Sequence, residues 1–281
     1  MPPLPSTSAQ AARRALADRL KEIMKDARLN GRALAAACGW HPAKVSRIRN
    51  AITPPSEDDI RAWCAACDAE EQVGDLLAAH SAAASAYVTW KRLHRGGMRQ
   101  VQVDGLALYL RTKHLRFYSS NVVPALLQTP AYATALIGTI SEFRRLPDDV
   151  EASVAARMER SRVLREGDHR IVILLEEAVL RTVIGSAEVM AEQLGVLLGV
   201  LGKPYVALGV IPFGAVREMW PTESFYMFDG ELVKEETLSA SISVTAPSDL
   251  DVYERAFRRL AGMAAYGPDA RRLIARAIEV L

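Results

Sequence analysis

Residues 31–50 constrain the fold of this chain more than any other segment, because they suit two short helices that cross over a tight turn. Ala35 provides a small side chain where the two backbones would approach. Gly39 provides a residue that tolerates a positive φ at the turn. Val45 and Ile48, three positions apart, would anchor the second helix inward. This spacing predicts a helix-turn-helix.

The flanking residues predict where the two helices begin. Asn30 is a suitable N-cap for the first helix, and His41 stands at the N-cap of the second. Pro42 follows at the first helical position, where its missing N–H costs nothing. The alternative interpretation of the same pattern is an αα-hairpin inside a helical bundle that has no role with DNA.

With Val45 and Ile48 facing inward, the second helix presents a basic face, and such a face can enter the major groove of double-stranded DNA. We assign base contacts to Pro42, Ala43, Lys44 and Arg47. We assign phosphate contacts to Arg32, His41, Ser46, Arg49 and Asn50. Phosphate contacts would provide affinity and salt dependence, and base contacts would provide sequence choice.

The distribution of charge is more informative than the formal net charge of +2. The first 55 residues hold ten Lys or Arg and three acidic residues, whereas residues 56–75 hold seven acidic residues and Arg61. A basic block beside an acidic one favours a domain with one side facing a polyanion. Ordinary solvated helix faces would produce the same asymmetry.

The composition points to a globular protein of the cytoplasm. Half of the 281 residues are hydrophobic, yet no apolar run approaches the ~18 residues that a membrane span needs. The first residues lack the basic and apolar regions of a signal peptide. Three cysteines in a chain of this length do not form a disulfide framework.

Hydrophobic periodicity predicts an α+β protein that is mainly α, with a helical N-terminal bundle and a small mixed sheet with helices toward the C-terminus. The expected divisions are a disordered leader (1–10), a helix-turn-helix DNA-binding domain (11–75), a helical connector (76–115) and an α+β regulatory or partner-binding domain (116–281). Expected elements include a helix over 70–93, mostly helical residues over 100–164, buried strands at 171–175 and 205–211, and a hairpin around Asp229-Gly230.

Residues 15–75 resemble the phage-repressor-type helix-turn-helix domains of the XRE class. The likeness is carried by LNGRALAAACGWHPAKVSRIRNAITPPSEDDIRAWCAAC, with its glycine turn and its serine-arginine-isoleucine step. Arg49 stands where that class usually has Glu, and it adds charge toward the DNA. Ala51 stands where the class usually has Gly, which is unfavourable if that turn needs a positive φ.

The remainder of the chain is similar to the C-terminal domain of actinobacterial WhiJ-like, antitoxin-like transcription regulators. The segments that carry this likeness are VVPALLQTPAYATALI (122–137), ARMERSRVL (156–164), LLEEAVLRTVIGSAEVMAEQLGVLL (174–198), VIPF (210–213) and SFYMFDG (224–230). The resemblance implies a regulator of development or secondary metabolism, often encoded beside a small partner protein.

The same segments contain a candidate ligand or partner site. Its members are Gln128, Thr129, Tyr132, Arg157, Arg160, Glu176 and Glu177. Structural salt bridges and the satisfaction of buried backbone groups explain these residues equally well.

Other patterns carry less functional information. Cys64-Ala-Ala-Cys67 lies on the apolar stripe of an expected helix, so core packing is favoured over a zinc site, which needs about four ligands. Residues 91–116 are rich in Lys and Arg, which suits either a second anion-contacting patch or a solvated helix face. The chain has no nucleotide-binding, hydrolase or metalloprotease motif, so we expect no enzyme, no metal and no cofactor.

Taken together, the residues and the resemblance predict a sequence-specific DNA-binding transcription regulator that works as a homodimer, because dimers read paired half-sites. Its C-terminal domain would sense a small-molecule effector or a partner protein. The alternative is an antitoxin-like module whose main role is capture of a small partner protein, with DNA binding serving autoregulation.

Overall fold

The computed structural model describes residues 8–82 and 87–281. The chain divides into two compact units, and neither is a single continuous stretch. The first comprises the described residues up to Tyr87 together with Ser243–Asp251. The second comprises Val88–Ile242 and Val252–Leu281. Most of the expected leader, residues 1–10, lies outside the described residues, and the first helix begins at Ser8.

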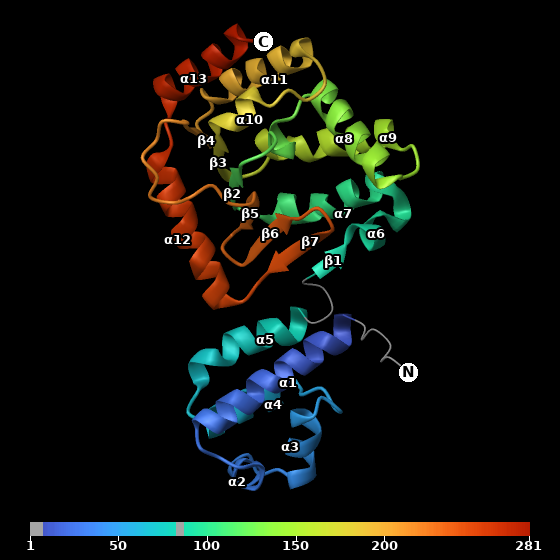
Figure 1. Ribbon diagram of the computed structural model, residues 1–281, viewed down its shortest axis with the longest axis vertical. Helices are drawn as coiled ribbons and strands as arrows, with labels where there is room; N and C mark the ends of the chain where they lie inside the picture. Colours follow the sequence, from blue (N-terminus) through green and yellow to red (C-terminus); the bar gives the residue numbers. More distant parts are fainter. Residues whose placement is uncertain (1–7, 83–86) are drawn as a thin grey trace. The chain divides into compact units, whose positions relative to one another are not determined.

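The first unit is built from short helices, drawn from blue to teal in Figure 1. Its elements are α1 (Ser8–Asp26), α2 (Gly31–Ala37), α3 (Pro42–Arg49), α4 (Glu57–Ala66), the short 3-10 helix η1 (Glu70–Gln72) and α5 (Val73–Ala82). Leu20, Ile60 and Trp63 are fully buried in its core. The Trp63 indole donates a hydrogen bond to the carbonyl oxygen of Leu20 at 3.1 Å, which satisfies the polar atom of this large core side chain.

The second unit contains all of a mixed sheet except Tyr87 and the last two residues of β7, which belong to the first unit. The strands are β1 (Tyr87–Thr89), β2 (His114–Ser119), β3 (Arg170–Glu176), β4 (Val206–Ile211), β5 (Phe225–Phe228), β6 (Leu232–Glu236) and β7 (Ala240–Val244). They lie in the order β1-β7-β6-β5-β2-β3-β4. β2, β3 and β4 are parallel to one another, whereas β5 is antiparallel to both β2 and β6.

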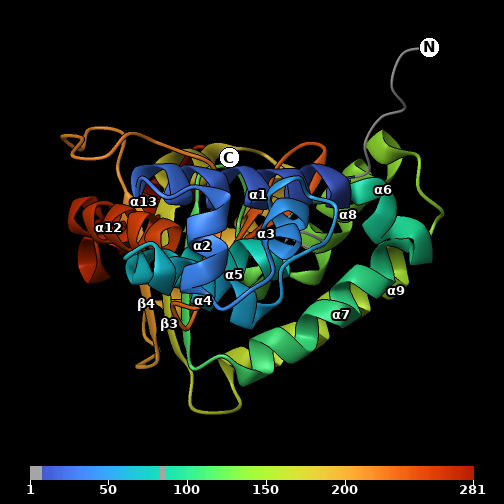
Figure 2. The same ribbon diagram turned by 90° about the horizontal axis from the view of Figure 1, so that it is seen from below.

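Helices cover this sheet and connect its strands. They are α6 (Trp90–Leu93), η2 (His94–Gly96), α7 (Gly97–Arg111), η3 (Ala125–Leu127), α8 (Pro130–Arg144), α9 (Val150–Arg160), η4 (Ser161–Leu164), α10 (Glu177–Arg181), α11 (Ala187–Val200), α12 (Pro247–Met263) and α13 (Gly267–Glu279). Figure 2 shows α7 running beside α9, and the two helices pack together.

The register of the strands separates the two faces of the sheet. Phe117 of β2 is paired with Tyr226 of β5. The Phe117 ring packs against the ring of Tyr109 of α7 in the main hydrophobic core. Phe225, one position earlier on β5, points to the opposite face, where its ring lies 6.3 Å from that of Phe257 on α12. The aromatic side chains that contact Tyr109 of α7, Phe117 and Phe228, therefore belong to one face of the sheet.

The α+β fold class is confirmed, and so are the strands at 171–175 and 205–211 and the hairpin at Asp229-Gly230. One expectation was wrong. The helix expected over 70–93 ends at Ala82, and Tyr87–Thr89 is a strand, because pairing with β7 outweighs the helical preference of the Ala-rich sequence before it. Residues 100–164 are mostly helical, as expected, but they also contain β2, a strand that was not predicted.

The residues of the expected connector are shared between the two units. α5 belongs to the first unit and α7 to the second, where α7 packs along α9.

Candidate nucleic-acid interface

The turn between α2 and α3 is closed by local hydrogen bonds. Asn30 Oδ1 accepts from the backbone N–H groups of Arg32 and Ala33, both at 3.0 Å, and so caps α2. Gly39 has a φ of 69°, and the following N–H, of Trp40, donates to the carbonyl of Ala35 at 2.7 Å. This is a Schellman ending, and it confirms the reason given for the glycine.

The start of α3 is fixed by its cap. His41 Nδ1 accepts from the backbone N–H of Ala43 at 3.2 Å, and Pro42 occupies the first helical position. Val45 and Ile48 are each 1% exposed and hold α3 in the core. Both predicted caps and both predicted anchors are confirmed, so the remaining side chains of α3 point away from the core.

The residues predicted to meet DNA lie on α3 or cap its ends, except Arg32, which lies on α2. Those that are exposed are Arg32, His41, Pro42, Ser46, Arg47 and Asn50, and those that are half-buried are Ala43, Lys44 and Arg49. Asn50 Nδ2 donates to Ser46 Oγ at 3.4 Å. Arg47 forms no ion pair with any side chain that the structure describes. Its guanidinium is therefore available to an external partner.

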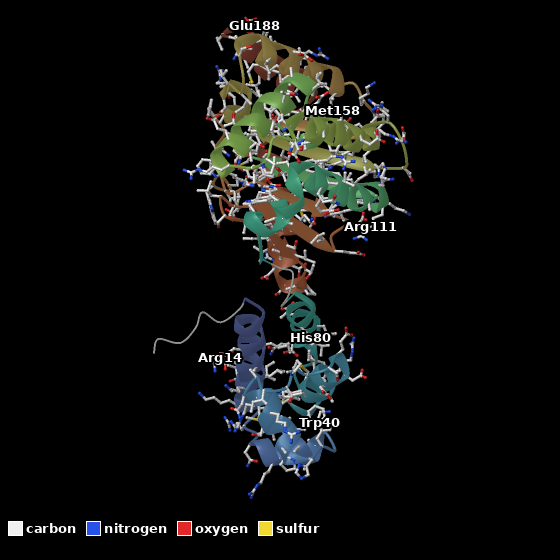
Figure 3. The ribbon with its side chains drawn as sticks, turned by 90° about the vertical axis from the view of Figure 1, so that its right-hand side faces the viewer. Arg14, Trp40, His80, Arg111, Met158 and Glu188 are labelled. Atoms are coloured by element: carbon white, nitrogen blue, oxygen red, sulfur yellow. The ribbon has the colours of Figure 1, made fainter. Side chains whose placement is uncertain are left out.

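Lys44 differs from Arg47, because its ammonium already has two partners. Nζ lies 2.6 Å from Asp59 Oδ1 and 4.2 Å from the centroid of the Trp40 ring, whose side chain is labelled in Figure 3. Burial alone raises the pKa of Asp59, but hydrogen bonds from Lys44 and from Ser56 bring the net pKa below its ordinary value. Asp59 also completes a capping box at the start of α4 with Ser56.

The end of α3 contains backbone strain. Ala51 has a φ of 54°, in the left-handed region, and the following N–H, of Ile52, donates to the carbonyl of Arg47 at 2.9 Å. This is the same Schellman geometry as at Gly39, with alanine in the position that favours glycine.

In the second unit, two of the predicted site residues, Arg157 and Arg160, meet through Gln102, which was not predicted. Gln102 Oε1 accepts from Arg157 Nε at 3.3 Å and from Arg160 Nη2 at 2.9 Å. Arg157 Nη1 also donates to Gln128 Oε1 at 2.7 Å. Gln102 lies on α7, so its role follows from the packing of α7 on α9 rather than from any sequence motif.

Thr129 and Tyr132 form the start of α8. Thr129 Oγ1 caps the helix by accepting from the N–H of Tyr132 at 3.2 Å, while the N–H of Thr129 donates to Gln193 Oε1 at 2.8 Å. The Tyr132 hydroxyl accepts from the N–H of Val123 at 3.2 Å. These contacts satisfy buried backbone groups, as the structural interpretation requires.

Glu176 and Glu177 belong to different networks. Glu176 forms a bidentate ion pair with Arg217, at 2.8 and 2.6 Å, and accepts from the Tyr118 hydroxyl. Glu177 pairs with Arg181 at 2.8 Å and accepts from the backbone N–H of Phe213 at 3.0 Å. Neither carboxylate is ion-paired with an arginine of α9, so these two residues are not part of the hydrogen-bond network around Gln102.

Comparisons with known families match both parts of the chain. A model described as a helix-turn-helix domain matches residues 15–78, and a model described as "Domain of unknown function (DUF5753)" matches residues 106–276, more than half of the 281 residues. The chain belongs to the DUF5753 family. No curated protein matches it. The match to a helix-turn-helix domain indicates a DNA-binding regulator.

Two further groups of residues in this DUF5753-family protein, the cysteines of α4 and the basic stretch 91–116, have the composition of possible sites. Cys64 and Cys67 are buried in the first core, and burial raises the pKa of both thiols, that of Cys64 to about 11. Across the described ranges, 8–82 and 87–281, no group of three or more His, Cys, Asp or Glu could hold a metal ion. In the basic stretch 91–116, Arg116 forms an ion pair with Glu254. The structure does not describe the side chains of Lys91, Arg92 and Arg95.

No helix among the described residues is long and apolar enough to cross a membrane.

Proposed function

We propose that this protein is a sequence-specific transcription regulator whose helix α3 enters the major groove of double-stranded DNA. The observation that supports this most directly is Arg47, an exposed arginine on a helix that Val45 and Ile48 anchor in the core. A fixed helix with an uncommitted guanidinium suits bidentate contact with guanine O6 and N7.

The other contacts follow from their places around Arg47. Pro42 and Ala43 at the start of α3 offer apolar contact to a thymine methyl group, and Lys44 reads a base after its ammonium leaves Asp59. The proposed phosphate contacts come from Arg32, His41, Ser46, Arg49 and Asn50. Because dimers read paired half-sites, we propose that the protein is a homodimer. We also propose that it acts in the cytoplasm and that it is a regulator of the WhiJ-like actinobacterial type.

We also propose that the DUF5753 unit acts as the sensor, for a small effector or a partner protein, and that the protein is not an enzyme. A specific observation favours the second candidate function, capture of a small partner protein. Between β4 and β5, Phe213, Val216 and Trp220 are 61%, 89% and 68% exposed. The Arg217–Glu176 ion pair holds this apolar loop in place, and exposed apolar patches often mark protein contacts.

The test is binding to duplex DNA from upstream of the protein's own gene, by fluorescence anisotropy across a salt series. Wild type is compared with Arg47→Ala and with Arg19→Ala, which removes an exposed arginine of α1 that pairs with Glu22. We expect Arg47→Ala to lose about 1–3 kcal/mol of discrimination between this DNA and an unrelated duplex. Arg19→Ala should match wild type.

Weak binding that is equal for both DNAs and for all three proteins would contradict the proposal. Stoichiometric co-elution of a small neighbouring gene product, with no sequence-selective binding, would favour the second candidate function instead.

A further inference from the structure

One segment of the second unit holds three arginines in two different situations. Arg162 is exposed and forms ion pairs with both Glu159 and Glu166. Arg157 and Arg160 are each 8% exposed, and neither forms an ion pair with a described carboxylate. Figure 3 labels Met158, which lies between them on α9. The paired arginine is thus at the surface, and the unpaired ones are inside.

The acceptors of the two buried guanidiniums are all neutral. Arg157 donates to the side-chain oxygens of Gln102 and Gln128, and Arg160 donates to the side-chain and backbone oxygens of Gln102. Arg160 Nε is buried without any hydrogen-bond partner. Two guanidiniums carry ten N–H donors, so these few amide oxygens leave much of their capacity unused.

A third cation adds to the imbalance. Lys234 of β6 is half-buried, and burial together with the charge of Arg160 lowers its pKa. Burial and, secondarily, the charge of Arg160 also lower the pKa of Arg157, to about 10. The charge of Glu236 raises the pKa of Arg157 and of Lys234 and so partly offsets these effects, but this carboxylate is exposed and forms no described ion pair with either cation.

Aromatic side chains and a glycine lie beside these cations. The Tyr109 ring lies 4.9 Å from the Arg160 guanidinium carbon, and Tyr226 is the cross-strand neighbour of Lys234, so both lie on the same face of the sheet. Gly105 of α7 leaves room for the Arg160 side chain, because a Cβ there would lie 3.1 Å from Nη2. The fold therefore accommodates Arg160 inside rather than excluding it.

A buried charge without a counter-charge is costly, and an anion supplied from outside removes that cost. We propose that Arg157, Arg160 and Lys234 form a binding site for the oxyanion group, phosphate or carboxylate, of a small molecule. Planar guanidiniums suit bidentate contact with either group. A small molecule fits the burial of these residues, whereas a nucleic acid or protein surface could not reach two side chains that are 8% exposed.

This inference does not depend on the proposed binding of DNA, and its test contains none. Isothermal titration calorimetry and thermal unfolding of the full chain are measured with inorganic phosphate and with succinate. Sodium chloride at equal ionic strength is the reference. The variants are Arg160→Met and Lys234→Gln, and Arg162→Gln serves as the matched control because Arg162 already has two carboxylate partners.

We expect phosphate or succinate, but not chloride, to give binding heat and to raise the unfolding midpoint of wild type. Arg160→Met and Lys234→Gln should each weaken binding about tenfold or more, and Arg162→Gln less than about twofold. Lys234→Gln keeps the test valid if Arg160→Met does not fold. A response to phosphate alone assigns a phosphate site, and a response to succinate alone assigns a carboxylate site.

The proposal is overturned if neither anion acts beyond chloride. It is equally overturned if all variants, the control included, respond like wild type.

Discussion

The arginine of α3 and the arginines of α9 are placed in opposite ways. Arg47 is exposed on a capped helix, so its charge is hydrated and adds little to the free energy of folding. Arg157 and Arg160 are enclosed between helices and depend on two glutamines for their hydrogen bonds. The first arrangement suits contact with a polymer that approaches from outside, and the second suits a small ligand that enters. Burial, rather than charge, distinguishes the two regions.

The largest effect is expected where the buried arginines lose their shared acceptor. Gln102→Met removes the side-chain oxygen that accepts from both Arg157 and Arg160, and it should lower the free energy of unfolding by about 2–3 kcal/mol. Gln100→Met, on the same helix but exposed, should change it by less than about 0.5 kcal/mol. Urea unfolding followed by circular dichroism measures both. Equal stability of the two variants would contradict the contrast drawn from burial.

The helix-turn-helix contains a strained backbone conformation at the end of α3, and this strain lowers the free energy of unfolding. Ala51→Gly should raise the free energy of unfolding by about 1 kcal/mol, because glycine adopts the φ of 54° without strain. Ala36→Gly, at an exposed position inside α2, should lower it by about 1 kcal/mol. Urea unfolding measures both variants. Changes of opposite sign in the free energy of unfolding would confirm the strain at Ala51, and a loss of stability in both variants would contradict it.

Lys44 sharpens the comparison, since it is the cation of α3 that has a carboxylate partner. Asp59 has a lowered pKa, so its contribution to stability is present above its ordinary value of 3.8 and disappears as the pH falls through the lower native value. We expect the free energy of unfolding of wild type to exceed that of Lys44→Met by about 0.5 kcal/mol at pH 6, with the difference vanishing once the pH falls below the native pKa of Asp59. Thermal unfolding across this range is the measurement. A difference that grows on acidification would be the wrong sign.

The smallest effect on folding is expected at Arg47. Arg47→Ala should change the free energy of unfolding by less than about 0.5 kcal/mol while it weakens DNA discrimination. A clear loss of stability in this variant would show that the guanidinium has a structural partner, and the contrast between the two regions would fail.

Much of the helix-turn-helix could be predicted from the sequence because its rules are local. The caps Asn30 and His41, the turn at Gly39 and the anchors Val45 and Ile48 each depend on residues a few positions away. The partner of Lys44 could not be predicted in this way, because Asp59 reaches it from another helix.

The second unit was harder to predict because its contacts join distant segments. The sequence groups Glu176 and Glu177 with Arg157 because all three lie in segments that resemble one family, yet the two carboxylates pair with Arg217 and Arg181. Gln102 was missed because no pattern marks a lone glutamine on α7 as the acceptor for α9. β2 was missed because its short alternation of buried and half-buried residues lies between two helical stretches.

The division of the chain affects how the protein is made. Ser243–Asp251 belongs to the first unit, and the N–H of Ser248 donates to Asp75 Oδ1 at 3.1 Å. A ribosome releases the helix-turn-helix long before it has synthesised this segment. The DNA-binding unit is therefore complete only when most of the DUF5753 region has also been translated. A nascent or prematurely terminated chain would carry the recognition helix without the last part of the unit that supports it.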